Sequence, residues 1–325
     1  MIKLATVGTS SITKKFLSAV ALSNRFKLSA VYSRTYEKAV RFAENYGTIP
    51  VYTDLYELAM TGIDAVYIAS PNVCHYNQSK IFLENGINVI CEKPIVCNTE
   101  EYRELKSLAD KNGVVYMEAI MSMYSPGYDI LHNAKGNLGS ISCARIDFCQ
   151  RSSRLDDYYS GIPQNIFDMS LYAGTLMDLG VYCVYGALDL FGMPKKIISK
   201  AHFSDDGSDM SGVSIFDYGN FSAILTYAKA GQSAIHSEII GEKGTITVES
   251  ISQYAGIKLI EKGVERPLMD FPARDVIMRG EVDAFADYIA GNRLLEYKEK
   301  SDLCEKVCVC MDKIKESAGI YYGPL

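Results

Sequence analysis

The sequence predicts an α/β protein with an N-terminal Rossmann domain, built on a doubly wound parallel sheet, and a second α/β domain built on a largely antiparallel sheet. Two observations support this fold class. Short apolar strands alternate with helical patterns over residues 1–119, which is typical of a parallel sheet covered on both faces. From residue 120 onward strand patterns joined by short turns dominate, as in antiparallel pairing.

The elements of the first domain follow in strict alternation. Its helices are expected to end near Gly47, Gly86 and Gly113, since glycine is favoured just past a helix. The expected strands are 2–7, 27–33, 49–52, 65–70, 87–92 and 114–119, and the expected helices are 12–23, 36–47, 54–60, 73–86 and 99–113.

The second domain, residues 120–325, begins with helical stretches and continues with strands. The turns Tyr218-Gly219-Asn220 and Glu242-Lys243-Gly244 are expected to join consecutive strands. A helix-rich region over 278–318 ends the chain, and its helices can pack back on the first domain. The expected strands are 140–150, 196–203, 213–218, 221–228, 233–241, 245–249 and 257–261.

Composition argues against several classes of protein. The net charge is −6 and no block of lysine or arginine occurs, which argues against a nucleic-acid partner. No apolar run approaches the roughly 18 residues of a membrane-spanning helix, and the N-terminus does not resemble a signal peptide. Nine cysteines without a regular framework suggest reduced thiols and a cytoplasmic protein. Cys304, Cys308 and Cys310 lie in a helical pattern and are interpreted as buried apolar residues, so no metal is expected.

Small residues follow the first strand, where a Rossmann domain binds the pyrophosphate of a dinucleotide at a helix N-terminus. Only the first glycine of the usual Gly-x-Gly-x-x-Gly pattern is present, so an ordinary strand–turn–helix remains an alternative. The candidate cofactor-binding residues of this loop are Gly8, Thr9, Ser10, Ser11 and Ile12.

The second strand ends at Ser33 and Arg34, where an enzyme specific for NAD usually has an acidic residue. A guanidinium group is suited to a phosphate. The sequence therefore predicts NADP(H) rather than NAD(H), with a plain surface arginine as the alternative.

Three segments together resemble the Gfo/Idh/MocA oxidoreductases, and the resemblance covers essentially the whole chain. They are AVYIASPNVCHY, NGINVICEKPI and GTLMDLGVYCVYGALDLFG. The Asp178-x-Gly180-x-Tyr182 motif is similar to the branch with tyrosine at this position, which includes dihydrodiol dehydrogenases. The resemblance implies that Ser70, Pro71, Asn72 and His75 lie along the nicotinamide end of the cofactor, and that Lys93 faces the nicotinamide and the substrate. It also implies an open-faced sheet that is used for oligomer contacts.

Glu92 and Lys93 end an apolar strand, and ligands of open α/β sheets bind at the carboxyl ends of strands. Pro94 restricts Lys93 to an extended backbone, and we expect the Lys93–Pro94 peptide to be cis. These residues are therefore predicted to lie beside the cofactor. The alternative is a strand end whose lysine pairs with a neighbouring acid.

Asp178 and Tyr182 are spaced to share one face of a helix. Oxidation of an alcohol requires a base for the hydroxyl proton, and an ammonium group near Tyr182 would favour its ionised form. Lys93, Asp178 and Tyr182 are therefore the predicted catalytic residues, with Asp178 hydrogen-bonding the substrate or orienting Lys93. The alternative is an amphipathic helix with a buried tyrosine and a partnered aspartate.

The predicted function is NADP(H)-dependent hydride transfer between nicotinamide and a secondary alcohol or carbonyl of a sugar, polyol or diol. Met123, Ser125 and Asn165 depart from residues that many relatives carry, so no particular substrate is named. A dinucleotide-dependent glycosidase and a non-catalytic dinucleotide sensor are the alternatives. Apolar residues on both faces of the 221–228 strand suggest at least a homodimer, unless helices of the same chain cover that sheet.

Overall fold

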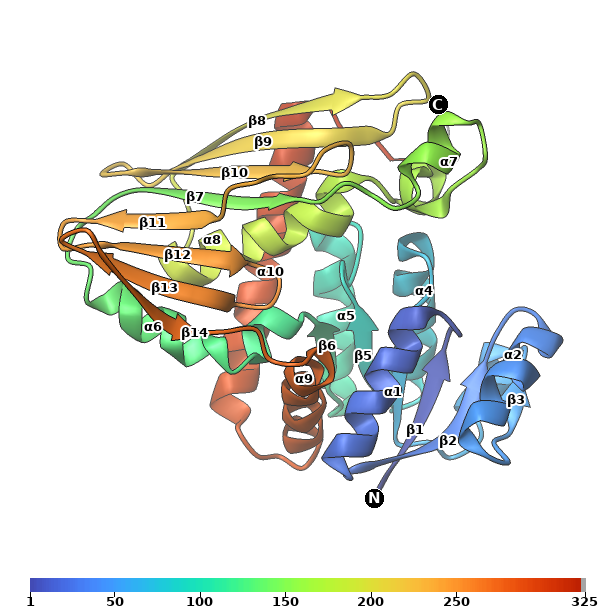
Figure 1. Cartoon of the computed structure of the whole chain (residues 1–325). Helices are drawn as coiled ribbons and strands as arrows, with labels where there is room; N and C mark the ends of the chain where they lie inside the picture. Colours follow the sequence, from blue (N-terminus) through green and yellow to red (C-terminus); the bar gives the residue numbers. More distant parts are fainter. Residues whose placement is uncertain (323–325) are drawn as a thin grey trace. The chain divides into compact units, whose positions relative to one another are not determined.

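The computed structural model describes residues 1–322, with the side chains of residues 274 and 275 left aside. The chain forms two compact units (Figure 1). Unit 1 comprises Met1–Ile120 and Ala273–Asp302, and unit 2 comprises Met121–Pro272 and Leu303–Leu325, of which 323–325 are outside the description. The first unit is therefore assembled from two segments that are far apart in the sequence.

Unit 1 contains a six-stranded parallel sheet in the order β3-β2-β1-β4-β5-β6. This is the doubly wound order that the strand–helix alternation predicted, and β1 and β4 lie at its centre. Its strands are β1 (Ile2–Val7), β2 (Phe26–Tyr32), β3 (Val51–Tyr52), β4 (Ala65–Ile68), β5 (Asn88–Glu92) and β6 (Tyr116–Ala119).

The helices of unit 1 follow the predicted pattern with one local difference. The region 36–47 is not a single helix, because α2 ends at Ala43 and a 3₁₀ turn, η1 (Glu44–Tyr46), continues to Gly47. Gly113 adopts the left-handed conformation that was expected past α5. The helices are α1 (Ser11–Ser23), α2 (Tyr36–Ala43), α3 (Leu55–Ala59), α4 (Asn72–Glu84), α5 (Thr99–Asn112), α9 (Arg274–Ile289) and the first part of α10 (Leu294–Ala318).

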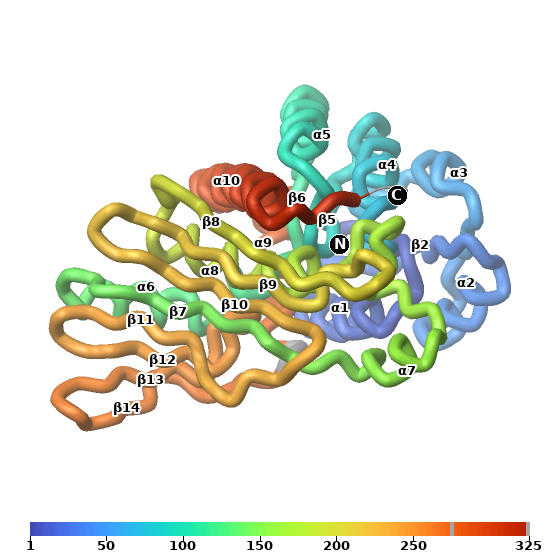
Figure 2. Tube along the Cα trace, turned by 90° about the horizontal axis from the view of Figure 1, so that it is seen from above, coloured from blue at the N-terminus to red at the C-terminus, as the bar shows by residue number. Residues whose placement is uncertain are grey.

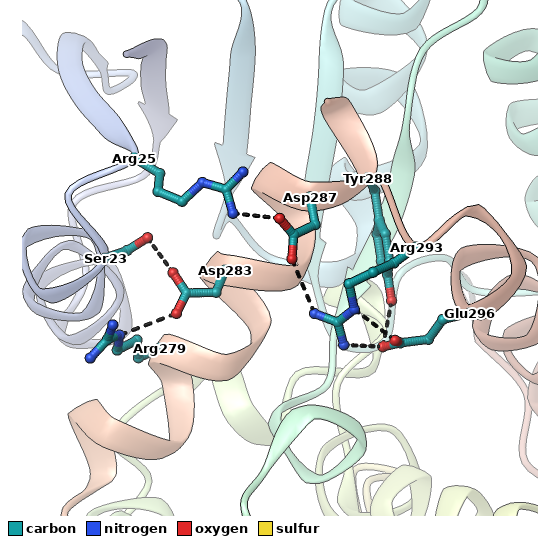
Figure 3. Close-up of polar contacts among 8 residues, drawn as sticks. All are labelled: Ser23, Arg25, Arg279, Asp283, Asp287, Tyr288, Arg293 and Glu296. Carbon is teal, nitrogen blue, oxygen red and sulfur yellow. Dashed lines mark hydrogen bonds and ion pairs between the residues drawn. The ribbon is translucent and has the colours of Figure 1, made fainter. Parts of the chain in front are cut away.

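The returning segment is fixed to the N-terminal part of unit 1 by helix α9, which packs against α1 (Figure 3). The ring of Phe285 stacks on that of Phe26 with centroids 5.8 Å apart. Polar contacts extend this packing from Ser23 and Arg25 to the start of α10. They join Ser23 to Asp283, Arg279 to Asp283, Arg25 to Asp287, Arg293 to Asp287 and Glu296, and Tyr288 to Glu296.

Unit 2 is built on an eight-stranded sheet in the order β14-β13-β12-β11-β7-β10-β9-β8. Only β7 and β10 pair in parallel among these neighbours, so the sheet is largely antiparallel as predicted. The strands are β7 (Ile141–Cys149), β8 (Lys196–Phe203), β9 (Asp209–Asp217), β10 (Ser222–Ala228), β11 (Ser237–Gly241), β12 (Thr245–Ser250), β13 (Ala255–Glu261) and β14 (Val264–Met269).

Strand β14 was not predicted, and the strands expected at 213–218 and 233–241 begin at Asp209 and Ser237 instead. β14 contains Pro267, which a strand tolerates at the edge of a sheet, and it pairs with β13 alone. The predicted turns at Gly219 and Gly244 do join β9 to β10 and β11 to β12.

Helices α6 (Gly127–Gly136) and α8 (Val181–Phe191) lie on one face of this sheet, and the strands lie side by side in front of them in Figure 2. The buried row of β10, Ala223, Leu225 and Tyr227, faces the helices. The remaining turns and helices are η2 (Met121–Tyr124), α7 (Leu155–Tyr159), η3 (Asn165–Phe167), η4 (Met169–Leu171) and η5 (Leu176–Gly180).

Two features of the structure relate to conclusions drawn from composition, one on membrane spans and one on the cysteines. The stretch Met169–Phe191, which was not singled out from the sequence, has the length and composition of a membrane-spanning helix, but 83% of its most apolar window is buried inside the protein, as in a core helix. Cys304, Cys308 and Cys310 are buried in α10, as predicted. All nine cysteines lie within residues 1–322 and are free thiols.

Candidate active site

The loop after β1 is shaped by Gly8. Its φ angle is +108°, and a Cβ at this position would collide with the carbonyl oxygen of Ala69. The nitrogen of Gly8 donates to the Tyr32 carbonyl, and the nitrogen of Ala69 donates to the Val7 carbonyl. The backbone at Gly8 is therefore held between the carboxyl ends of β2 and β4, in a space that only glycine can occupy.

Helix α1 begins at Ser11, directly after this loop, and its first turn carries Lys14 and no acidic residue. Backbone N–H groups at a helix N-terminus attract an anion. Ser10 precedes the helix with an extended backbone, and its hydroxyl lies 3.3 Å from that of Thr13. The close-packed glycine and the helix start fit the pyrophosphate of a dinucleotide.

Ser33 and Arg34 follow β2, beside the Gly8 loop. Arg34 is exposed, and the hydroxyl of Ser33 accepts a hydrogen bond from the nitrogen of Thr35. Burial raises the pKa of Cys74, in the first turn of α4, and the charge of Arg34 opposes that rise. The guanidinium of Arg34 is therefore at the same edge of the sheet as the start of α4, where it is accessible to a phosphate.

Glu92 is held at the end of β5 by Tyr67. The phenol of Tyr67 donates to Oε1 of Glu92 over 2.5 Å, and its ring stacks on Phe16 of α1 with centroids 3.7 Å apart. Burial, and then the charge of Glu92, raise the pKa of Tyr67 well above its ordinary value. Tyr67 therefore remains a protonated donor that fixes the carboxylate next to Lys93.

The Lys93–Pro94 peptide is cis, as predicted from the sequence. The loop that follows is anchored by Glu118 of β6, which is buried and accepts a hydrogen bond from the nitrogen of Ile95 over 2.9 Å. Lys93 itself is only partly buried. The lysine is thus partly accessible and projects from a backbone that is fixed on both sides.

His75 is fully buried and does not lie at the surface of unit 1. Its Nδ1 is 2.8 Å from the carbonyl oxygen of Pro94, and its Nε2 is 3.0 Å from that of Ser70. Burial lowers the pKa of His75, the two carbonyl contacts oppose this, and the charge of Lys93 lowers it further. The imidazole therefore connects the loop after β4 with the Lys93–Pro94 turn.

The other predicted residues of the loop after β4 lie at the start of α4. The Ser70 hydroxyl donates to Oε1 of Gln78, Pro71 precedes the helix and Asn72 begins it. The structure thus brings the predicted cofactor-binding residues of unit 1 to the carboxyl edge of one sheet. Tyr67 and Glu118 were not predicted from the sequence, although a glutamate within the apolar strand VVYMEA was a usable signal.

Asp178 and Tyr182 lie in unit 2, but not in one regular helix as the spacing suggested. Asp178 belongs to the π-helical turn η5, and Tyr182 follows in the first turn of α8. Gly180 between them packs on the ring of Tyr227, 3.2 Å from where its Cβ would be. π-Helical turns are frequent at functional sites.

The two side chains differ in environment. The Asp178 side chain is 40% exposed and forms an ion pair with Lys229, with Oδ2 3.1 Å from Nζ. Tyr182 is buried, and its ring meets that of Phe148 edge-on at 5.7 Å. Lys229 was not predicted from the sequence, because a single lysine after a strand gives no indication of its partner.

Two of the positions that depart from the expected family pattern are part of the core in this chain. Met123 and Ser125 are buried, and the Ser125 hydroxyl accepts a hydrogen bond from the nitrogen of Gly127. Asn165, in η3, is exposed. Within residues 1–322, no group of three or more His, Cys, Asp or Glu side chains is arranged to hold a metal ion.

Comparison with known proteins identifies the family. The model of the oxidoreductase family with an NAD-binding Rossmann fold matches residues 2–120, and the GFO/IDH/MocA C-terminal domain matches residues 133–247. The scyllo-inositol 2-dehydrogenase (NADP(+)) IolU of Bacillus subtilis (strain 168) is 35% identical over 99% of this chain and 98% of its own length. The trans-1,2-dihydrobenzene-1,2-diol dehydrogenase of Xenopus tropicalis is 29% identical over 73% of this chain and 71% of its own.

A solved structure extends the likeness to the fold of both units. The crystal structure of a 3-ketoreductase from Actinomadura kijaniata, in complex with NADP and TDP-benzene, matches with a TM-score of 0.84 at 21% identity, over 99% of each chain. The sequence motifs, the order of the strands and these relatives agree. The chain belongs to the Gfo/Idh/MocA family of oxidoreductases.

Proposed function

We propose that the protein is an NADP(H)-dependent oxidoreductase that transfers a hydride between nicotinamide and a secondary alcohol or carbonyl of a sugar, polyol or related diol. The observation that carries the substrate class is the 35% identity, over nearly the full length of both chains, to an enzyme named for oxidation of scyllo-inositol. The dihydrodiol dehydrogenase relative also acts, by its name, on neighbouring hydroxyl groups of a ring.

NADP(H) is the proposed cofactor because of the residues after β2. An exposed guanidinium at Arg34 and the neighbouring Ser33 hydroxyl suit a 2′-phosphate, and the carboxylate that would favour NAD is replaced. The relative IolU is also named as an NADP(+) enzyme. In this proposal the pyrophosphate binds at Gly8 and the start of α1, and the residues from Ser70 to Asn72 lie along the nicotinamide end.

Alcohol oxidation removes a hydride from carbon and a proton from oxygen. Bound NADP(H) would accept or supply the hydride. We assign the proton transfer to the phenol of Tyr182, because the motif that resembles dihydrodiol dehydrogenases has tyrosine here in place of histidine. We assign the hydrogen bond to the substrate to Asp178, whose side chain is 40% exposed. Lys93 is required for the same step, as a positive charge that favours loss of the phenolic proton. The assignment rests on the family motifs and is tested kinetically.

The function is tested by screening sugars, inositols and diols with NADP⁺ and NAD⁺, following the absorbance of reduced nicotinamide. We expect turnover with at least one polyol and a higher kcat/KM for NADP⁺. Glycoside cleavage without net reduction would instead identify a dinucleotide-dependent glycosidase. Tight NADPH binding without turnover on any substrate would favour a sensor.

We further propose that unit 2 forms a homodimer through the sheet face opposite α6 and α8. Ile198, Ile215 and Ile224 lie in one row across β8, β9 and β10, and they are 48%, 39% and 43% exposed. Exposed apolar side chains in register are unusual for a face that stays in water. Sedimentation should show a dimer for the wild type and a monomer for Ile215→Lys, and a wild-type monomer at micromolar concentration would contradict the proposal.

We also propose a cytoplasmic location, because nine free thiols suit a reducing compartment.

A further inference from the structure

Lys229 is a buried lysine that follows strand β10. Its side chain is 2% exposed, although it carries an ammonium group. Burying an ammonium is unfavourable unless the charge is paired and its N–H groups are hydrogen-bonded. The contacts of Lys229 therefore indicate what its charge is used for.

The ammonium is held by two segments that precede α8. Its Nζ lies 3.1 Å from Oδ2 of Asp178 in η5, and it donates to the carbonyl oxygen of Ile166 over 2.7 Å. It also lies 5.4 Å from the centroid of the Phe167 ring, within range of a cation–π interaction. Lys229 thus connects η3 with η5 and has the carboxylate of Asp178 as its counter-ion.

A second carboxylate, which is buried, also contacts this turn. Asp209, at the start of β9, is fully buried and accepts a hydrogen bond through Oδ2 from the nitrogen of Leu176 over 2.7 Å. Leu176 is the first residue of η5. Burial raises the pKa of Asp209 to about 7, while the Leu176 N–H and the charge of Lys229 act in the opposite direction. Asp209 thus contacts the backbone of η5, and Lys229 contacts the Asp178 carboxylate of the same turn.

We propose that Lys229 is a positioning residue that fixes the Asp178 carboxylate for the substrate. The inference rests on the proposed function, in which Asp178 hydrogen-bonds the reacting substrate. One side of the carboxylate contacts a buried ammonium, while the side chain as a whole remains 40% exposed and can be reached from solvent. Since Lys229 itself is almost inaccessible, it acts through Asp178 and not on the substrate.

The test is a double-mutant cycle with Lys229→Met, Asp178→Asn and the double variant, measured as kcat and KM on an active polyol. We expect Lys229→Met to lower kcat by roughly 10²-fold, the loss typical of a reactive group displaced by about an ångström. In the Asp178→Asn background the same change should cost little more. Equal losses from Lys229→Met in both backgrounds, or unchanged kinetics, would overturn the proposal.

A matched control separates this role from the general cost of removing a lysine. Lys258 of β13 also pairs with carboxylates, those of Glu249 and Glu265, but it is 32% exposed. Lys258→Met should leave kcat unchanged. NADPH affinity, measured by fluorescence, should be unchanged in every variant, because the expected defect lies in the catalytic step.

The pH dependence gives a readout that a merely structural role would not change. Without its ammonium, the carboxylate of Asp178 takes up a proton more readily, so the acidic limb of the kcat profile should move to higher pH in Lys229→Met. Lys229→Arg, which keeps the charge, should retain the wild-type limb. An acidic limb at the same pH in Lys229→Met would contradict the inference.

Carboxyl ¹³C NMR tests the ion pair without measuring turnover. It uses Lys229→Gln, so the result does not depend on whether Lys229→Met folds. In aspartate-labelled protein, the Asp178 resonance is the one that disappears in Asp178→Asn. Its titration should move to higher pH in Lys229→Gln and remain in place in Lys258→Met. If Asp178→Asn retains full turnover, the catalytic role of Asp178 fails, whereas an unmoved Asp178 resonance refutes the pairing with Lys229.

Discussion

Replacement of His75 tests whether this buried imidazole controls Lys93. The side chain is 0% exposed, and its two nitrogens face the carbonyl oxygens of Pro94 and Ser70 at 2.8 and 3.0 Å. The amide nitrogen of asparagine can replace Nδ1, and that of glutamine can replace Nε2. His75→Asn should therefore keep the contact with Pro94, and His75→Gln the contact with Ser70.

The magnitude follows from the one carbonyl to which the neutral imidazole, with its single N–H, can donate. A buried polar group that loses its partner costs about 1–3 kcal/mol, so the variant that leaves this carbonyl without a donor should lower the free energy of unfolding by about that amount. The catalytic effect should differ between them, because Pro94 adjoins Lys93. A displacement of Lys93 by about 1 Å would cost roughly 10²-fold in kcat. We therefore expect His75→Gln to lose much more activity than His75→Asn.

The assay combines urea unfolding with kcat and KM for both variants. His236, which is exposed, supplies the control His236→Asn, expected to change neither quantity. Equal loss of kcat in His75→Asn and His75→Gln would refute the link through Pro94. If either His75 variant changes the stereochemistry or the proton inventory of the reaction while its free energy of unfolding is unchanged, the imidazole itself takes part in the reaction.

The same residue predicts a pH dependence of stability. Burial lowers the pKa of His75 in the folded protein, whereas an exposed histidine titrates near pH 6.5. As the pH falls through about 6.5, the unfolded chain binds its proton first, so the free energy of unfolding decreases. This contribution is fully present above that pH. In His75→Asn the corresponding slope should disappear from the pH series of urea unfolding.

Four further outcomes are expected. Arg34→Ala should weaken NADPH binding at least tenfold more than NADH binding in fluorescence titrations, and equal losses would refute the assignment. Tyr182→Phe should lower kcat by roughly 10²–10⁴-fold with NADPH affinity unchanged; near-wild-type turnover with a rate-limiting chemical step would move the proton to another group. Gly8→Ala should abolish NADPH binding in calorimetry. Its control is Gly47→Ala, where φ is +100° and no described atom beyond the adjacent residues lies within 4 Å of the added Cβ. This control should lower the free energy of unfolding only by backbone strain of about 1–3 kcal/mol. Asp287→Ala breaks partly exposed ion pairs with two arginines and should lower the free energy of unfolding by about 1 kcal/mol in urea, so a loss above 3 kcal/mol would contradict this account.

Most of the fold was predictable because its signals are local. Apolar strands, helix-ending glycines and short turns appear within windows of a few residues, and they located nearly every strand of both sheets. Strand β14 shows the limit, since VERPLM has charged residues and a proline in place of apolar alternation. Its strand geometry comes from pairing with β13, which is a tertiary contact.

The positions of the candidate site residues in unit 1 were predictable where those residues follow the ends of strands. Gly8, Arg34 and Lys93 follow strands whose carboxyl ends must meet at one edge, so their proximity follows from topology. The partners of these residues are different: Tyr67 reaches Glu92, and Lys229 reaches Asp178, across sequence separations that no local pattern encodes. The spacing of Asp178 and Tyr182 also misled, because it does not reveal a π-helical turn.

The two-segment composition of unit 1 has a consequence for how the protein is made. During synthesis, residues 1–120 leave the ribosome long before α9 (Arg274–Ile289) does. This helix packs on α1 and contacts Ser23 and Arg25. Domains generally fold in order of synthesis, and exposed apolar surface favours aggregation. The nascent dinucleotide-binding unit must therefore wait, with Phe26 uncovered by Phe285, until all of the intervening residues have been translated. A chain that stops at residue 272 would lack the helix that packs on α1, so its first unit would be left incomplete.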